Sequence, residues 1–213
     1  MANYPLLVLV FGISLLLSYL LTPLMKKIAF QTKILSKPGR RSVHARPVPY
    51  LGGLAMYFAF TITILVACYV NPQFNIEYQK ITGLIIGGTI ILLLGLWDDI
   101  KDVRPLIKLF GQVLVALILF GYGFRIELVT NPLNGAELTM PLFLSLLFTI
   151  SWVLALINAM NLIDGLDGLA AGITFIVCGA LFFIALYLKN YLNMFLLVIF
   201  HSLTAPRLRL ICK

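Results

Sequence analysis

Charged side chains are scarce in this sequence. Asp, Glu, Lys and Arg make up 11% of the 213 residues, while apolar residues make up 61%. A soluble domain carries roughly 25% charged residues to cover its surface. The long apolar runs also lack the polar stripes that a water-exposed helix needs. The composition therefore excludes an ordinary soluble domain and favours a protein embedded in a lipid bilayer.

Cysteine is equally sparse. Cys68 and Cys178 fall within apolar runs, and Cys212 lies near the end of the sequence. Their spacing matches neither a zinc site nor a disulfide framework. We therefore expect free, buried thiols rather than metal ligands or cross-links.

Long apolar runs are abundant, and a membrane-spanning helix takes about 20 such residues. Six runs are long enough, or nearly so, and a seventh is incomplete: Tyr4–Met25, Leu51–Val70, Ile81–Trp97, Pro105–Tyr122, Met140–Ile157, Leu169–Leu188 and Met194–Phe200. The sequence thus predicts an all-α polytopic membrane protein, with one integral membrane domain over residues 1–213. The segment 123–139 between two runs is rich in turn residues and predicts turns or a short hairpin.

Basic residues predict the orientation of the spans. No Lys or Arg precedes the first run, whereas Lys26 and Lys27 follow it, so this run does not resemble a cleaved signal peptide and the N-terminus should face outward. Alternating spans give inner loops at 26–50, 98–104 and 158–168. The outer loops carry only Lys80, Arg125 and Lys189. This asymmetry accounts for most of the net charge of +8, so the membrane, and not nucleic acid, is the expected partner.

The eight carboxylates are distributed unevenly. Glu77, Glu127 and Glu137 fall in outer loops, where a solvated surface explains them. The other five fall in inner loops at the ends of spans: Asp98, Asp99, Asp102, Asp164 and Asp167. Because the topology rests on Lys and Arg alone, this clustering on one face is an independent observation.

The first acidic segment, 95–105, ends the third span and begins the fourth. The adjacent carboxylates of Asp98 and Asp99 are unfavourable at the C-terminal end of a helix, and they repel each other unless a cation offsets them. A solvated turn neutralised by Lys101 and Arg104 is the alternative interpretation.

In the second acidic segment, polar residues recur at every third position: Asn158, Asn161, Asp164 and Asp167. If the segment begins as a helix, this spacing places their side chains near one face. Gly165 and Gly168 would then allow left-handed turns and a close approach of ligand to backbone. A capped helix end, with Asn and Asp as turn formers, is the alternative.

Oxygen ligands from two loops on one membrane face favour a hard cation, Mg²⁺ or alternatively Mn²⁺, that bridges phosphates. The basic first loop, which contains His44 and Arg46, suits anions. Together these features indicate phosphoryl transfer at the cytoplasmic surface with a membrane-held phosphate as one substrate. Positioning and charge neutralisation would supply most of the catalysis.

Three motifs together resemble the polyprenyl-phosphate N-acetylhexosamine-1-phosphate transferase family, glycosyltransferase family 4. They are Arg46 through Gly53, Gly95 through Asp99 with Lys108 and Gln112 downstream, and Asn158 through Gly172. The first loop is more similar to bacterial undecaprenyl-phosphate N-acetylglucosamine-1-phosphate transferases than to phospho-N-acetylmuramoyl-pentapeptide transferases. The resemblance implies a multi-pass protein of the bacterial cytoplasmic membrane that transfers a sugar-1-phosphate from a UDP-sugar to undecaprenyl phosphate. UMP would leave, and the product would prime teichoic acids, O antigens or other envelope glycans; a homodimer is a further expectation.

The resemblance also implies roles for individual residues. Asp98 and Asp99 would form the metal and phosphate centre and, with Asp164, carry the catalysis. Asn161 and Asp164 would shape the nucleotide-sugar site, and Asp167 would face the uridine. The remaining candidates for phosphate contacts are Lys108, His44 and Arg46.

The sequence departs from the family pattern near its end. The family continues with a Gly-Asp motif, which supplies a metal-binding Asp, and a His-rich cytoplasmic loop, and neither is present here. Pro206, Arg207 and Arg209 interrupt what should be the middle of a seventh span. We therefore expect a truncated or frameshifted product that lacks part of its active site.

Two other functions stay open. A cation-coupled transporter or channel should place ionisable groups near the bilayer midplane, whereas the five inner Asp residues lie at span ends. A non-catalytic membrane subunit that binds a nucleotide-sugar enzyme would keep its function when Asp99 or Asp164 is replaced.

Overall fold

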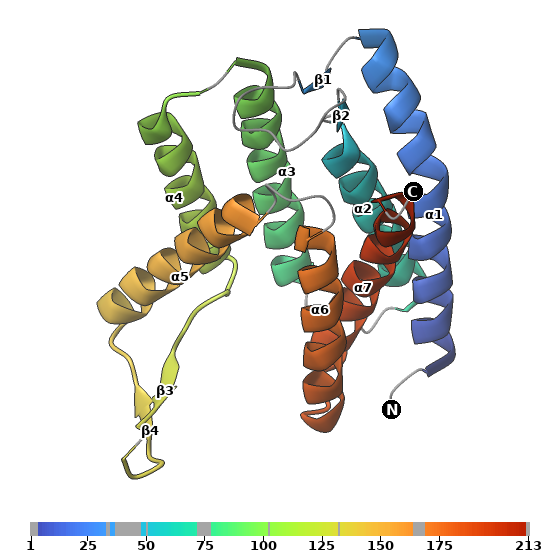
Figure 1. The fold of residues 1–213 in the computed structure, drawn as a ribbon. Coiled ribbons are helices and arrows are strands. Elements are labelled where there is room, and N and C mark those ends of the chain that lie inside the picture. Colours follow the sequence, from blue (N-terminus) through green and yellow to red (C-terminus); the bar gives the residue numbers. More distant parts are fainter. Residues whose placement is uncertain are drawn as a thin grey trace. The chain divides into compact units, whose positions relative to one another are not determined.

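The structure, a computed structural model, describes residues 4–32, 35–36, 48–49, 51–71, 78–101, 103–131, 133–163 and 169–211. The helices are α1 (Tyr4–Thr32), α2 (Gly52–Val70), α3 (Tyr78–Lys101), α4 (Pro105–Gly121), α5 (Leu142–Ile163), α6 (Leu169–Tyr187) and α7 (Tyr191–Ile211) (Figure 1). The strands are β1 (Leu35–Ser36), β2 (Val48–Pro49), β3 (Leu128–Thr130) and β4 (Glu137–Thr139). The chain forms two compact units, one of Met1–Glu77 with Leu162–Lys213 and the other of Tyr78–Asn161.

The prediction of an all-α polytopic membrane protein is confirmed. Five helices are at least 18 residues long and apolar enough to cross a membrane, namely those in α1, α2, α3, α5 and α6. Helix α4 has 17 residues, which is the lower limit for a span. Helix α1 has 29 residues, and at 1.5 Å per residue it is longer than the roughly 30 Å hydrocarbon core. Its last turns, which carry Lys26 and Lys27, can therefore extend beyond the lipid.

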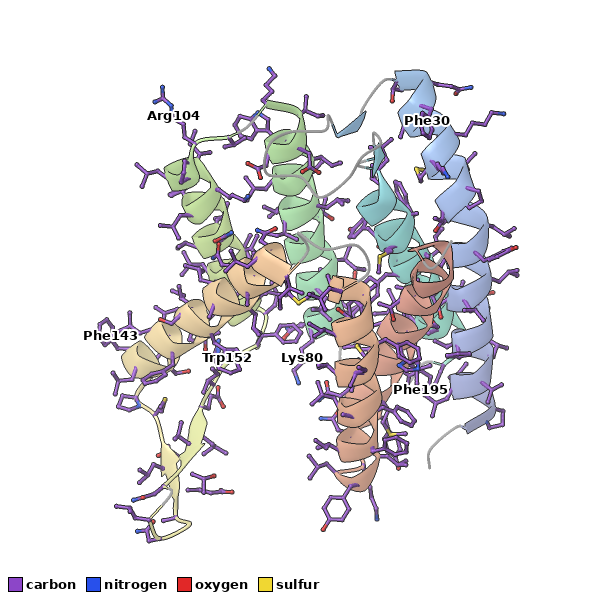
Figure 2. All side chains as sticks on the ribbon, viewed as in Figure 1. Phe30, Lys80, Arg104, Phe143, Trp152 and Phe195 are labelled. Carbon is purple, nitrogen blue, oxygen red and sulfur yellow. The ribbon has the colours of Figure 1, made fainter. Side chains whose placement is uncertain are left out.

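Large apolar side chains cover the outside of the helices. On α5, Phe143 is 67% exposed and Trp152 is 59% exposed, and both project away from the helix (Figure 2). Val8 on α1 and Phe183 on α6 are exposed to a similar degree. In water such surfaces would drive association, whereas lipid tails solvate them without cost. The exposed faces thus agree with a bilayer environment.

In the first unit, α7 packs between α1 and α6 through a few polar contacts. The hydroxyls of Ser14 and Ser202 share a hydrogen bond, and Ser18 Oγ donates to the Leu203 carbonyl at 3.2 Å. On the other side, His201 Nδ1 lies 3.0 Å from the Phe175 carbonyl oxygen, and the two rings stack at 3.8 Å. Small residues and hydrogen bonds of this kind are typical of helix contacts in membranes.

Helix α7 extends further than the sequence indicated. The predicted run stops at Phe200, but the helix continues through Pro206 to Ile211. A proline removes one backbone hydrogen bond and crowds the preceding turn, yet it does not end this helix. In the preceding turns, Ser202 and Leu203 form hydrogen bonds with α1. Where the structure describes its side chains, the apolar stretch of α7 is Tyr191–Thr204, which contains the predicted run Met194–Phe200 and is shorter than a full span.

In the second unit, glycines allow α3 and α4 to approach closely. The Tyr122 side chain lies over Gly83, and Leu119 lies over Gly87. Near the other end of the hairpin, Leu94 of α3 lies over Gly111 of α4. Each glycine accepts a side chain from the facing helix or, for Gly83, from the residue that directly follows it, so the antiparallel pair packs closely from one end to the other.

A β-hairpin joins α4 to α5, in agreement with the sequence prediction. Its strands pair Leu128 with Thr139 and Thr130 with Glu137, and Gly135 in the turn has a φ of +69°. At the base, Thr149 Oγ1 of α5 accepts a hydrogen bond from the Ile126 N–H at 3.0 Å. The strands β1 and β2 form a second, shorter antiparallel pair that the sequence did not predict.

Replacing Gly83 by Ala should destabilise the second unit by about 1–3 kcal/mol, the usual cost of overpacking. The new methyl group would lie 2.5 Å from Tyr122 Cβ, an atom that cannot move without the backbone. The matched control is Gly95→Ala in the same helix, where a methyl group meets no described atom within 4 Å. Thermal unfolding in detergent should show a lower midpoint for the first variant and an equal or higher midpoint for the control.

Candidate active site at the turn between α3 and α4

An ion pair links the end of α3 to the start of α4. Lys108 Nζ donates to Asp98 Oδ2 at 2.5 Å, and the two side chains are 30% and 23% exposed. Pro105 occupies the first turn of α4, as predicted, because its missing N–H costs nothing there. It starts α4 just after the turn, so that Lys108 lies one turn into the helix, opposite Asp98.

Lys108 neutralises part of the negative charge of the two adjacent carboxylates, Asp98 and Asp99. Two adjacent carboxylates at a helix C-terminus need a cation nearby, and Lys108 supplies it to Asp98. The alternative interpretation assigned this role to Lys101 and Arg104. Instead, Arg104 is exposed and projects away from the helices (Figure 2). Asp99, next to the ion pair, is exposed at the end of α3.

A second polar contact lies one turn further along α4. Gln112 is only 2% exposed, and its carbonyl oxygen accepts a hydrogen bond from Asn158 Nδ2 of α5 at 2.9 Å. In return, Gln112 Nε2 lies 3.5 Å from Asn158 Oδ1. The Asn158 amide also donates to the Leu154 carbonyl at 2.8 Å. The two amides thus form a reciprocal pair between α4 and α5.

The structure places part of the second acidic segment. Helix α5 ends at Ile163, so Asn158 and Asn161 lie in its last turns, as the sequence predicted. They are three residues apart and therefore share one side of the helix. The remaining candidates lie outside the described residues: Asp164, Asp167, His44 and Arg46. The short strand pair β1–β2 flanks in sequence the loop that contains the last two of these.

The donor atoms at the turn suit a hard cation. Within the described parts of the chain, no group of three His, Cys, Asp or Glu residues could hold a metal ion. However, Mg²⁺ commonly binds to one or two carboxylates and takes its other ligands from water and phosphate. The carboxylates of Asp98 and Asp99 fit this pattern. An ionised carboxylate has about four acceptor positions, so the bond from Lys108 to Asp98 leaves capacity for a cation.

The sequence interpretation gave no role to Gln112 and no partner to Asn158. One signal was available: beyond Lys108, Gln112 is the only strongly polar residue in the apolar run that forms α4. An amide within a membrane span needs a hydrogen-bond partner. The identity of that partner could not be read from the sequence, because Asn158 lies 46 positions away.

These observations define a polytopic membrane protein with a charged, oxygen-rich site at the ends of its spans. Comparison with known proteins agrees with this class: glycosyl transferase family 4 matches residues 81–208, more than half of the sequence. The chain belongs to glycosyl transferase family 4.

Similar proteins come from several bacteria. A probable undecaprenyl-phosphate N-acetylglucosaminyl 1-phosphate transferase of Bacillus subtilis is 30% identical over 79% of this chain and 45% of its own length. A decaprenyl-phosphate N-acetylglucosaminephosphotransferase of Mycolicibacterium smegmatis is 32% identical over 78% and 42%. An undecaprenyl-phosphate alpha-N-acetylglucosaminyl 1-phosphate transferase of Thermotoga maritima is 32% identical over 75% and 46%. The matches thus cover less than half the length of each of these relatives.

The Asp98–Lys108 pair should stabilise the α3–α4 hairpin by about 1 kcal/mol, because its short, partly buried contact suffers less solvent screening than an exposed pair. A double-mutant cycle with Asp98→Asn and Lys108→Met, followed by unfolding in detergent, measures this coupling. The control cycle uses Arg125 and Glu127, which are 3.9 Å apart with the glutamate side chain 67% exposed. We expect the coupling free energy between Arg125 and Glu127 to be near zero. Equal coupling free energies in both cycles would contradict a stabilising role for the Asp98–Lys108 pair.

Proposed function

We propose that this chain transfers N-acetylglucosamine-1-phosphate from UDP-N-acetylglucosamine to undecaprenyl phosphate, with release of UMP. The reaction would occur at the cytoplasmic face of a bacterial cell membrane and supply a lipid-linked sugar for envelope glycans. The observation that carries the proposal is the Asp98–Asp99 pair with Lys108 at the end of a span, in a chain that belongs to glycosyl transferase family 4. The names of its relatives support a polyprenyl phosphate acceptor and an N-acetylglucosamine phosphate group.

The chemistry of the acceptor fits a site at the membrane surface. An oxygen of the lipid phosphate would attack the phosphorus that carries the sugar, and the bond from this phosphorus to the UMP oxygen would break. The attacking oxygen is already ionised near neutral pH, so no strong base is required. The protein therefore mainly has to hold two anions together and lower their repulsion.

The charged residues suit these tasks. Lys108 would lie beside the phosphates, with Asp98 holding its ammonium group in place. Asp99 and Asp164 would share the catalytic centre. The donor would be bound by Asn161 and Asp167, with further phosphate contacts from His44 and Arg46. The assembly of two copies as a homodimer stays a prediction.

A divalent cation belongs to this proposal. Mg²⁺, or Mn²⁺, would neutralise phosphate charge when bound. Asp98 and Asp99 would hold it, because their carboxylates are hard oxygen donors at the turn where the phosphates are expected.

UMP release in detergent, from UDP-N-acetylglucosamine with undecaprenyl phosphate and Mg²⁺, tests the proposal. Asp99→Asn should lower the rate by about 10²-fold or more, as expected when a charged group of a catalytic site is lost. Glu137→Gln, on the exposed strand β4, is the matched control and should keep the full rate.

If the folded chain releases no UMP alone, the part of a longer relative that the match leaves uncovered can be supplied as a second chain. Release that appears only with the second chain would show that this chain forms part of the enzyme. No release under either condition would contradict the proposed function and favour a non-catalytic membrane subunit.

Chelation tests the metal separately. EDTA should abolish UMP release, and added Mg²⁺ should restore it, because two phosphate anions cannot approach without charge neutralisation. Restoration by Mn²⁺ but not by Ca²⁺ would agree with a small octahedral cation. Undiminished release in excess EDTA would rule out the metal requirement.

A further inference from the structure

The described contacts of α4 converge on one of its sides. Lys108, Gly111, Gln112, Val115 and Leu119 recur at the spacing of a single helix face. Four of them contact α3: Lys108 binds Asp98, Gly111 receives Leu94, and both Val115 and Leu119 lie over Gly87. The same side also carries Gln112, which binds α5.

The contact between the Gln112 and Asn158 amides depends on their relative orientation. Gln112 is almost completely buried, and each amide can both donate and accept, so the two side chains fit in one mutual orientation. A leucine at either position would fill a similar space without requiring any orientation. Asn158 is exposed apart from this contact, but the buried Gln112 amide has it as its partner, so the pair specifies how α5 lies against α4.

The connection links the two halves of the proposed site. Gln112 lies one turn from Lys108 on α4, and Asn158 lies one turn before Asn161 on α5. A change in the α4–α5 contact would therefore move the Asp98–Lys108 pair relative to Asn161. A shift of about 1 Å can cost a rate factor of about 10².

We propose that Gln112 and Asn158 are positioning residues that set the register between the phosphate-binding side of the site on α3–α4 and the donor-binding side on α5. This inference rests on the proposed function for its catalytic consequence. The register itself is a property of the fold and can be measured without activity.

Steady-state kinetics test the catalytic consequence. Gln112→Leu and Asn158→Leu should each lower kcat about 10-fold or more and change KM for either substrate less than about 3-fold, because each half of the site stays intact. The double Leu variant should be no worse than either single variant, since both remove the same contact. The exchange of the two residues, Gln112→Asn with Asn158→Gln, should recover much of the rate.

The matched control is Thr149→Val in α5. This change also removes side-chain hydrogen bonds, a part-buried one from the Ile126 N–H and a buried one to the Ser145 carbonyl, but at the hairpin end of the helix. It should lower the unfolding midpoint and leave kcat unchanged. If Asn158→Leu raises KM for the donor while Gln112→Leu has no kinetic effect, Asn158 contacts substrate directly and the positioning role is wrong.

A distance measurement separates this inference from the proposed function. Spin labels at Leu114 on α4 and Leu156 on α5, both exposed, report the register in a background with Cys68, Cys178 and Cys212 replaced by Ser. Gln112→Leu should broaden the distance distribution, and the exchanged pair should keep it narrow. An unchanged distribution in Gln112→Leu overturns the inference whether or not the chain releases UMP. Broadening in a chain without UMP release supports the register and contradicts only the proposed function.

Discussion

The absence of water in the bilayer core is the constraint on which the rest of this structure depends. A polar group placed in lipid has to find its hydrogen-bond partner within the protein. The chain meets this demand with few contacts, such as Ser14 with Ser202 in the first unit and Gln112 with Asn158 in the second. Because burial of apolar surface against lipid gives no preference for one helix over another, these contacts and the close packing at glycines decide which helices lie together. The hydroxyls of Thr61 and Ser145 have no hydrogen-bond partner in the described structure, and nothing in it explains them.

Helix α4 has a central place in the second unit. Glycines let it lie close to α3, and the ion pair at the turn joins the two helices where the lipid ends. An ion pair is better tolerated at this level than deeper in the membrane, since water reaches its partly exposed side chains. The burial decreases from Gln112, a buried amide whose hydrogen bonds are made within the protein, to Lys108, a charged group that is partly exposed. In the second unit, the neutral amide is thus the more buried group and the charged ammonium group the more exposed one.

The position of the charged residues at the end of a span favours an enzyme that acts at the membrane surface over a transporter. A transporter needs ionisable groups along its path, and in the described part of the chain the Asp side chains gather at the end of α3 instead. The family relationship points in the same direction, because the similar proteins are named as phosphotransferases of polyprenyl phosphates. The match covers 45% and 42% of two of these relatives, and an activity assay tests the complete reaction.

The sequence by itself determined the class of protein, the positions of the spans, the hairpin between α4 and α5 and the gathering of Asp residues at span ends. These features follow from local properties: bilayer thickness sets the length of an apolar run, and turn residues have fixed backbone preferences. Only the tertiary structure decided that Lys108, and not Lys101 or Arg104, binds Asp98, that Gln112 pairs with Asn158, and that α7 continues past Phe200. Such choices depend on which helix faces meet, and helical periodicity in one segment does not specify the face of another.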